Sequence, residues 1–274
     1  MDNIAANIIG QYEIMDEDKR LEGGFGQLEK ERAKELIARY LWKEGLTIVD
    51  AGGATGAYSL WLAALGHSVH LIDIVPKHVA LAEQKAQATP KTHRFKASVG
   101  DARVLPEIAD GSVDLVISHG PLYHLTDRND RLATLSEARR ILKPGGILLA
   151  FTITRYAGIN YAIPNGLVFD ETYYSVMREE VLTGLCNNNP RRISTFTNAF
   201  FHLPEEIRDE VREAGLEYEK TLGVIGTAWL VPELDHGWRD EAKRERILAV
   251  ARLLENEPVL GPRMMTVARK EPMS

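Results

Sequence analysis

The sequence lacks several features that would place it in a specialised class of protein. Among its 274 residues there is one cysteine, Cys186, which excludes an internal disulfide and fits a reducing cytosol. No apolar run approaches the roughly 20 residues that span a bilayer. Residues 1–7 lack the basic region and apolar core of a signal peptide. We therefore expect a cytoplasmic protein with no membrane partner.

Positive charge is not in excess either. The 33 lysines and arginines are outnumbered by 39 acids, which gives a net charge of −6 and argues against a broad nucleic-acid-binding surface. A hydrophobic fraction of 45% and a charged fraction of 26% are those of an ordinary globular protein. The length allows one large α/β domain with an insertion, or two small domains. The oligomeric state stays open.

The most informative stretch is residues 47–59, which read TIVDAGGATGAYS. The pattern predicts a buried strand closed by Asp50, a tight turn of small residues and a helix start. Glycines let the backbone approach a ligand, and a helix start offers unpaired N–H groups, so this is a nucleotide-type site. The dehydrogenase pattern G-x-G-x-x-G fits poorly, because Ala54 and Ala57 occupy its later positions, and no Walker A lysine follows.

Two further acids follow predicted strands. Asp73 stands 21 positions beyond Gly52, where a nucleotide-binding βαβ unit places the acid that accepts the ribose hydroxyls. Asp101 follows Gly100 after the third strand, and a simple turn residue or helix N-cap is its alternative role. With Asp50, these acids form a series at successive strand ends.

The hydrophobic pattern predicts alternating strands and helices, and therefore an open, mostly parallel sheet with helices on both faces. After the opening strand at 48–50, further strands are expected over 68–73, 93–98, 113–118, 147–153, 216–224 and 264–269. Helices are expected over 4–20, 27–42, 76–88, 127–142, 170–185, 205–214 and 234–257.

These motifs resemble the class I S-adenosylmethionine-dependent methyltransferases, with a core like that of ubiquinone/menaquinone C-methylases. Asp50-x-Gly52-x-Ala54-x-Gly56 matches the family's D/E-x-G-x-G-x-G, with Ala54 replacing the middle glycine; we expect a negative φ there. Gly100-Asp101 is similar to the third motif, and the string ARRILKPGGILL at 138–149 to the last core motif. The resemblance covers residues 45–153 strongly and 204–270 more weakly.

The resemblance implies a Rossmann-like, doubly wound α/β fold of seven strands with an antiparallel last strand. Four parts are expected: an N-terminal helical flap (1–44), the S-adenosylmethionine-binding core (45–153), a lid over the acceptor site (154–203) and the completion of the sheet (204–274). A glycine hinge at 22–26 suggests that the flap moves, although an ordinary packing helix with a turn is the alternative. The lid segment is too long for a plain connection, but a purely structural insertion is also possible.

The cofactor that the resemblance implies is S-adenosyl-L-methionine, with S-adenosyl-L-homocysteine as the product. The backbone of residues 52–56 would face the methionine part of the cofactor, and Asp73 would face the ribose. Asp101 with Ala102 would face the adenine. Asp50 would orient the turn or the amino group of the cofactor. His78 either contacts the adenine or faces solvent. The full set of expected cofactor contacts is Tyr12, Asp50, Gly52, Gly53, Ala54, Gly56, Asp73, Ile74, His78, Gly100, Asp101, Ala102 and His119. No metal ligand set is expected.

A general base is needed only if the acceptor loses a proton. His119, Tyr123 and His124 are the catalytic candidates after the fourth strand, and His124 could instead be a packing residue. Tyr156, Tyr161 and Tyr173 suggest a lid for an apolar or aromatic small molecule. Alternatives are an RNA or protein methyltransferase, a non-catalytic S-adenosylmethionine sensor, and a nicotinamide-dependent oxidoreductase, which the missing glycine pattern disfavours.

Overall fold

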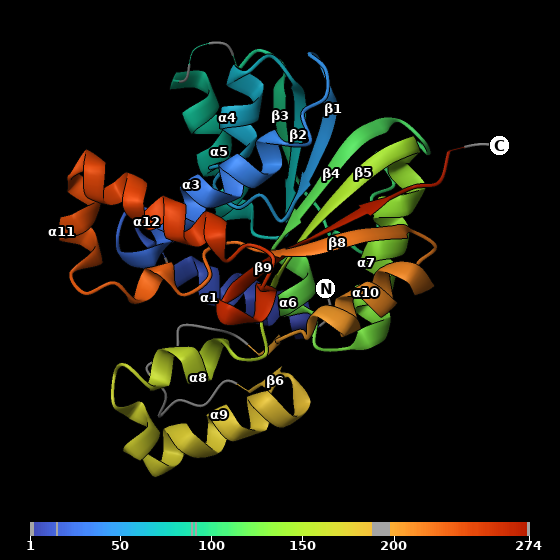
Figure 1. Ribbon diagram of the computed structural model, residues 1–274. Helices are drawn as coiled ribbons and strands as arrows, with labels where there is room; N and C mark the ends of the chain where they lie inside the picture. Colours follow the sequence, from blue (N-terminus) through green and yellow to red (C-terminus); the bar gives the residue numbers. More distant parts are fainter. Residues whose placement is uncertain (1–2, 15, 89, 91, 188–197, 273–274) are drawn as a thin grey trace.

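The computed structural model describes residues 3–14, 16–88, 90, 92–187 and 198–272. A seven-stranded sheet forms its centre, in the order β3-β2-β1-β4-β5-β9-β8 (Figure 1). The strands up to β5 are parallel, and β9 is antiparallel to both of its neighbours. The predicted fold class is therefore confirmed. The sheet strands are β1 (Thr47–Ala51), β2 (Ser68–Asp73), β3 (Phe95–Val99), β4 (Val113–His119), β5 (Leu142–Ile153), β8 (Glu217–Gly223) and β9 (Arg263–Arg269).

Helices cover both faces of this sheet. Successive side chains of a strand point to opposite faces, and in the central strands the side chains on both faces are apolar. In β5, Leu149 and Phe151 join the cluster formed with α3, α4 and α12, whereas Leu148 and Ala150 join the cluster formed with α7 and α10. The helices are α1 (Asn3–Ile14), α2 (Glu17–Arg20), α3 (Gly24–Ala38), α4 (Ser59–Ala64), α5 (Pro76–Ala88), α6 (Pro121–His124), α7 (Arg128–Ile141), α8 (Ala157–Ala162), α9 (Glu171–Thr183), α10 (Pro204–Glu213), α11 (Leu234–Arg239) and α12 (Glu241–Leu253), with short 3₁₀ turns η1 (Leu167–Phe169), η2 (Ala228–Leu230) and η3 (Pro258–Leu260).

Several predicted boundaries need correction. The helix expected over 27–42 ends at Ala38, and the one expected over 234–257 is divided where Asp240 caps the start of α12. The last core motif belongs to β5 from Leu142 onward, because Pro144 forces Lys143 into extended backbone and so ends α7. The segment from 154 contains the short helix α8, which sequence reasoning missed.

The segment 154–203 forms an arm beyond the end of β5 (Figure 1). It consists of α8, η1, α9 and a two-stranded ribbon of β6 (Leu185–Cys186) and β7 (Ala199–Phe200). Part of the predicted lid, residues 188–197, lies outside the described residues. Among the helices that the structure describes, none is long and apolar enough to cross a membrane.

The parallel register places three functional strand ends together. β1 lies between β2 and β4, so the residues that follow Ala51, Asp73 and His119 meet at one edge of the sheet. Strand order reverses between β1 and β4, and open α/β sheets bind ligands in the crevice at such a reversal.

Candidate functional site

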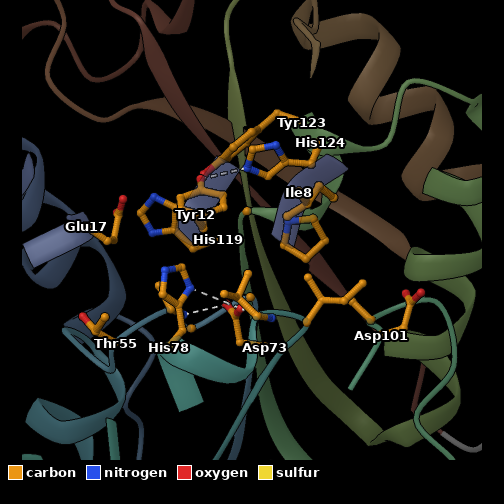
Figure 2. Close-up of a pocket in the computed structure, with 18 of the residues that line it drawn as sticks. Ile8, Tyr12, Glu17, Thr55, Asp73, His78, Asp101, His119, Tyr123 and His124 are labelled. Atoms are coloured by element: carbon orange, nitrogen blue, oxygen red, sulfur yellow. Dashed lines mark hydrogen bonds and ion pairs between the residues drawn. The ribbon is translucent and has the colours of Figure 1, made fainter. Parts of the chain in front are cut away.

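A pocket lies at this edge of the sheet (Figure 2). It brings together thirteen of the fifteen predicted site residues, from the turn after β1, the ends of β2 and β4, the loop after β3, and α1. Those residues are Tyr12, Gly52, Gly53, Ala54, Asp73, Ile74, His78, Gly100, Asp101, Ala102, His119, Tyr123 and His124. Asp50 and Gly56 lie outside the pocket lining.

Close packing explains the glycines of the turn. Gly52 has a φ of +80°, and a Cβ atom there would lie 2.5 Å from Cδ of Pro121. A Cβ atom on Gly53 would lie 2.8 Å from Oδ2 of Asp50. The backbone after β1 therefore runs directly against the backbone after β4, where a side chain would separate them.

The expectation for Ala54 is wrong. Its φ is +47°, in the left-handed region that costs an L-residue with a Cβ about 1–2 kcal/mol. This is the position at which the family pattern has glycine. The strained conformation is held by a hydrogen bond from the Ala54 N–H to Oδ2 of Asp73, at 2.9 Å.

Asp73 ties two neighbouring strand ends together. Besides the Ala54 N–H, its carboxylate accepts from the Val75 N–H at 2.9 Å through Oδ1. The Nδ1 atom of His78 lies 3.3 Å from the same Oδ1 (Figure 2). Asp73 is therefore both pocket lining and the support of the turn, a second role that sequence reasoning did not assign.

Asp50 supports the turn from behind. It is fully buried, and its Oδ2 accepts a hydrogen bond from Ser59 Oγ at 2.6 Å. Burial raises the pKa of the Asp50 carboxyl to about 7, opposed by the Ser59 hydrogen bond and reinforced by the charge of Asp73. Asp50 is therefore bonded to the start of α4 and has no direct place in the pocket, and its orienting role stays a prediction.

The Asp101 carboxylate is already engaged. Its Oδ2 accepts from Nη2 of Arg103 at 2.6 Å, and its Oδ1 accepts from the Arg103 backbone N–H at 2.9 Å. Arg103 also reaches Asp130, with Nη1 at 2.9 Å from Oδ1. An adenine amino group at Asp101 would thus share the carboxylate with Arg103, a residue that sequence reasoning missed.

The N-terminal flap covers the pocket. Ala5, Ile8 and Tyr12 of α1 belong to its lining, and the Tyr12 hydroxyl lies 3.0 Å from Nε2 of His124. Burial lowers the pKa of His124 to about 4, so the imidazole is neutral at pH 7. Outside the pocket, Lys85 of α5 pairs with Asp18 of α2 at 2.6 Å. These contacts attach α1 and α2 to the core of the fold.

The predicted lid tyrosines take no part in this cover. None of Tyr156, Tyr161 and Tyr173 belongs to the pocket lining. Tyr161 instead stacks on Trp229, with ring centroids 6.4 Å apart. In this conformation the covering element is the flap, and a role of the arm at the acceptor stays a prediction.

The structure adds lining residues that sequence reasoning did not name as site residues. They reach the pocket only through the flap or through loop packing: Ala5, Ile8, Glu17, Arg20, Leu21, Thr55, Ala57, Tyr58, Val75, Arg103, Gly120, Pro121 and Leu125. Among them, Pro121 could have been found from its place directly after the fourth strand. Glu17 and Arg20 resemble any solvent-facing helix pair in sequence, because only the tertiary fold buries them.

Comparison with known proteins identifies a methyltransferase domain in the chain. Residues 49–150 match the model of a methyltransferase domain. The ubiquinone/menaquinone biosynthesis C-methyltransferase of Acidiphilium cryptum is 34% identical over 54% of this chain and 57% of its own. Together these matches support a class I S-adenosylmethionine-dependent methyltransferase. Its family cofactor, S-adenosylmethionine, is the one that the motifs indicated.

Two other relatives support this assignment. The ubiquinone biosynthesis O-methyltransferase of Cereibacter sphaeroides is 30% identical over 66% of this chain and 64% of its own. Magnesium protoporphyrin IX methyltransferase of Synechocystis, solved with bound S-adenosylhomocysteine, shares the fold with a TM-score of 0.62 at 16% identity, over 98% of this chain and all of that one. The chain spans about three fifths of the length of the curated relatives named here.

Proposed function

We propose that the protein transfers a methyl group from S-adenosylmethionine to a small-molecule acceptor, apolar or aromatic in character. The observation that carries this proposal is the convergence of the turn after β1, Asp73 and Asp101 on one pocket beneath the flap. The relatives named above act on small molecules related to quinones or on a porphyrin, which favours an acceptor of that class.

The residues present fit the cofactor. Five buried polar atoms of the lining make no hydrogen bond within the described part of the chain: Glu17 Oε2, the Tyr58 hydroxyl, His78 Nε2 and both ring nitrogens of His119. Buried polar atoms normally have partners, so a polar ligand in this pocket accounts for them. In our assignment the backbone of residues 52–55 faces the methionine end, Asp73 the ribose, and Asp101 with Ala102 the adenine. Tyr12, Ile74, His78 and Gly100 complete the set.

The chain itself has a limited chemical task. When bound, S-adenosylmethionine supplies a methyl group that its sulfonium charge has already activated. The protein then has to hold the acceptor in line with that methyl group and to exclude water. The closed flap supports water exclusion, because Ile8 and Tyr12 cover the pocket, and the turn held by Asp50 and Asp73 supports fixed positioning.

Other readings are kept as alternatives. A methyltransferase acting on RNA or protein, or a sensor that binds S-adenosylmethionine without catalysis, would use the same pocket. A cytoplasmic location also belongs to the proposal, and the single buried thiol of Cys186 is compatible with it.

Calorimetry with S-adenosylmethionine, S-adenosylhomocysteine and NAD tests the ligand. We expect both methionine-derived ligands to bind and NAD to give no response; tight NAD binding with no response to the other two refutes the proposal. Transfer of a labelled methyl group into a metabolite extract then separates enzyme from sensor. Firm cofactor binding with no incorporation would favour the sensor.

A further inference from the structure

The imidazole of His119 is held with both ring faces covered. Tyr58 stacks on one face, with centroids 5.1 Å apart and planes 19° apart, and Phe151 on the other, at 4.2 Å and 9°. Only the ring edge is left for polar contact. Because His119 also lines the pocket, this edge is the part of the residue that can meet a ligand.

One position on that edge faces a buried carboxylate. Nε2 of His119 lies 3.5 Å from Oε1 of Glu29, on α3. Glu29 is completely buried, and it is surrounded by two cations: Nη1 of Arg20 lies 3.6 Å away and Nε of Arg263 lies 3.5 Å away. These charges hold the pKa of the Glu29 carboxyl well below its usual range, although burial alone would raise it. Glu29 is therefore a fixed negative charge behind the imidazole.

This cluster joins α2, α3 and β9 through buried charges and not through apolar groups. Buried ion pairs often contribute little net stability, since desolvation offsets their attraction. Both carboxylate oxygens of Glu29 and both ring nitrogens of His119 lack a hydrogen bond within the described residues. Four elements, α2, α3, β4 and β9, nevertheless bring these groups together beside the pocket, where His119 and Arg20 belong to the lining.

The geometry points to a base for a hydroxylated acceptor: we propose that His119, oriented by Glu29, removes the proton from the hydroxyl of a phenol-type ring. With its proton on Nε2, the ring directs that N–H at the Glu29 carboxylate 3.5 Å away, and this leaves Nδ1 as the proton acceptor. The proposal rests on the proposed methyl transfer. Glu29 acts through His119 and is a positioning residue, whereas His119 contacts the acceptor.

The step balances without any further reactant. The hydroxyl proton passes to Nδ1 of His119, and the electron pair left on the oxygen, or on the ring carbon conjugated with it, forms the new bond to the methyl carbon. If carbon is methylated, the hydrogen on that carbon then leaves as a proton to water, and the oxygen takes back the proton held by His119. The carbon–sulfur bond breaks with its electron pair going to sulfur, which gives neutral S-adenosylhomocysteine. A carboxylate behind the imidazole favours this transfer because it stabilises the imidazolium that forms.

The surroundings favour a flat ring over an aliphatic amine or thiol. Tyr12, Tyr58 and Tyr123 contribute aromatic side chains to the lining, and Leu21 and Leu125 add apolar surface. Arg263 lies over the Tyr123 ring, 4.8 Å from its centroid, and its charge is paired with that of Glu29. A neutral hydroxylated ring fits both features.

The first test needs no turnover. Nitrogen NMR of His119, assigned by comparison with His119→Gln, is recorded across pH with S-adenosylhomocysteine bound. The charged and titratable groups around this imidazole are Glu17, Arg20, Glu29, Tyr58, Tyr123 and Arg263. We expect the Nε2–H tautomer in the wild type and a lower titration midpoint in Glu29→Gln. Glu31→Gln, an exposed acid of the same helix, is the control that should match the wild type.

The second test identifies the acceptor class. The protein is incubated with methyl-labelled S-adenosylmethionine and a metabolite extract, and the labelled products are characterised. Label on the oxygen or a ring carbon of hydroxylated rings supports the proposal; label only on amines or thiols overturns it. With that acceptor purified, His119→Gln should lose about 100-fold or more in kcat, whereas Glu31→Gln should keep the wild-type rate.

The outcomes distinguish the assignment of His119 as a base from the proposed methyl transfer on which it rests. If the wild type binds neither S-adenosylmethionine nor S-adenosylhomocysteine, the proposed function itself fails. If both bind but His119→Gln keeps its rate, or if the titration midpoint in Glu29→Gln equals that of the wild type, the base assignment fails and methyl transfer stands.

Discussion

Asp73→Ala would separate the two roles of the acid at the end of β2. The substitution removes the acceptor of two backbone N–H groups, those of Ala54 and Val75. Val75 is 1% exposed, so its N–H is left buried without a partner at a cost of about 1–3 kcal/mol. The Ala54 N–H is only partly buried and water can replace its acceptor. We expect a loss of about 2–3 kcal/mol in the free energy of unfolding, measured by urea titration without cofactor.

The same variant should bind the cofactor more weakly. Unpaired ribose hydroxyls cost about 1–3 kcal/mol, which corresponds to a rise of roughly 5- to 150-fold in the Kd for S-adenosylhomocysteine. Because a loosened turn would also weaken binding, Asp73→Asn is measured beside it. The amide keeps one acceptor oxygen, so we expect a smaller change in both stability and Kd.

A matched control is Asp127→Asn. Asp127 also accepts from a backbone N–H, that of Asn129 at 2.7 Å, as the cap of α7, and it lies outside the pocket. Asn caps helices about as well as Asp, so stability and Kd should hardly change. An unchanged Kd in both Asp73 variants would contradict the ribose role. Unchanged stability in Asp73→Ala would contradict its support of the turn.

Two further predictions concern the turn after β1. Ala54→Gly should remove about 1–2 kcal/mol of left-handed strain from the folded state, while the added entropy of the unfolded state costs about 0.4–1 kcal/mol. Ala57→Gly should show only the entropy cost. Equal destabilisation of the two variants in urea would show that Ala54 carries no strain. Burial raises the pKa of Asp50 in the folded state to about 7, so between about pH 4 and 7 the folded protein keeps a proton that the unfolded chain releases. The free energy of unfolding therefore falls as pH rises through this range, by up to about 4 kcal/mol. Asp50→Asn should lose this component of the pH dependence, and an identical pH profile of unfolding in both proteins would disprove it.

Much of the core could be predicted because its signals are local. β2 and α5 have the bounds that the hydrophobic pattern predicted, since strand and helix periodicity are written into consecutive residues. The conformation of Ala54 could not be predicted this way. Its positive φ is imposed from outside the turn, by Asp73 of the next strand.

The sequence by itself determined the family, the order of the strands and the acids at their ends, because each motif lies within one short segment whose pattern encodes a strand, a turn or a helix. Only the tertiary structure decided what covers the pocket and what stands behind His119. Glu29, Arg20 and Arg263 come from elements far apart in the chain and meet through sheet order and helix packing. In sequence they are ordinary charged residues, and burial together in a medium of low dielectric is what gives them their chemistry.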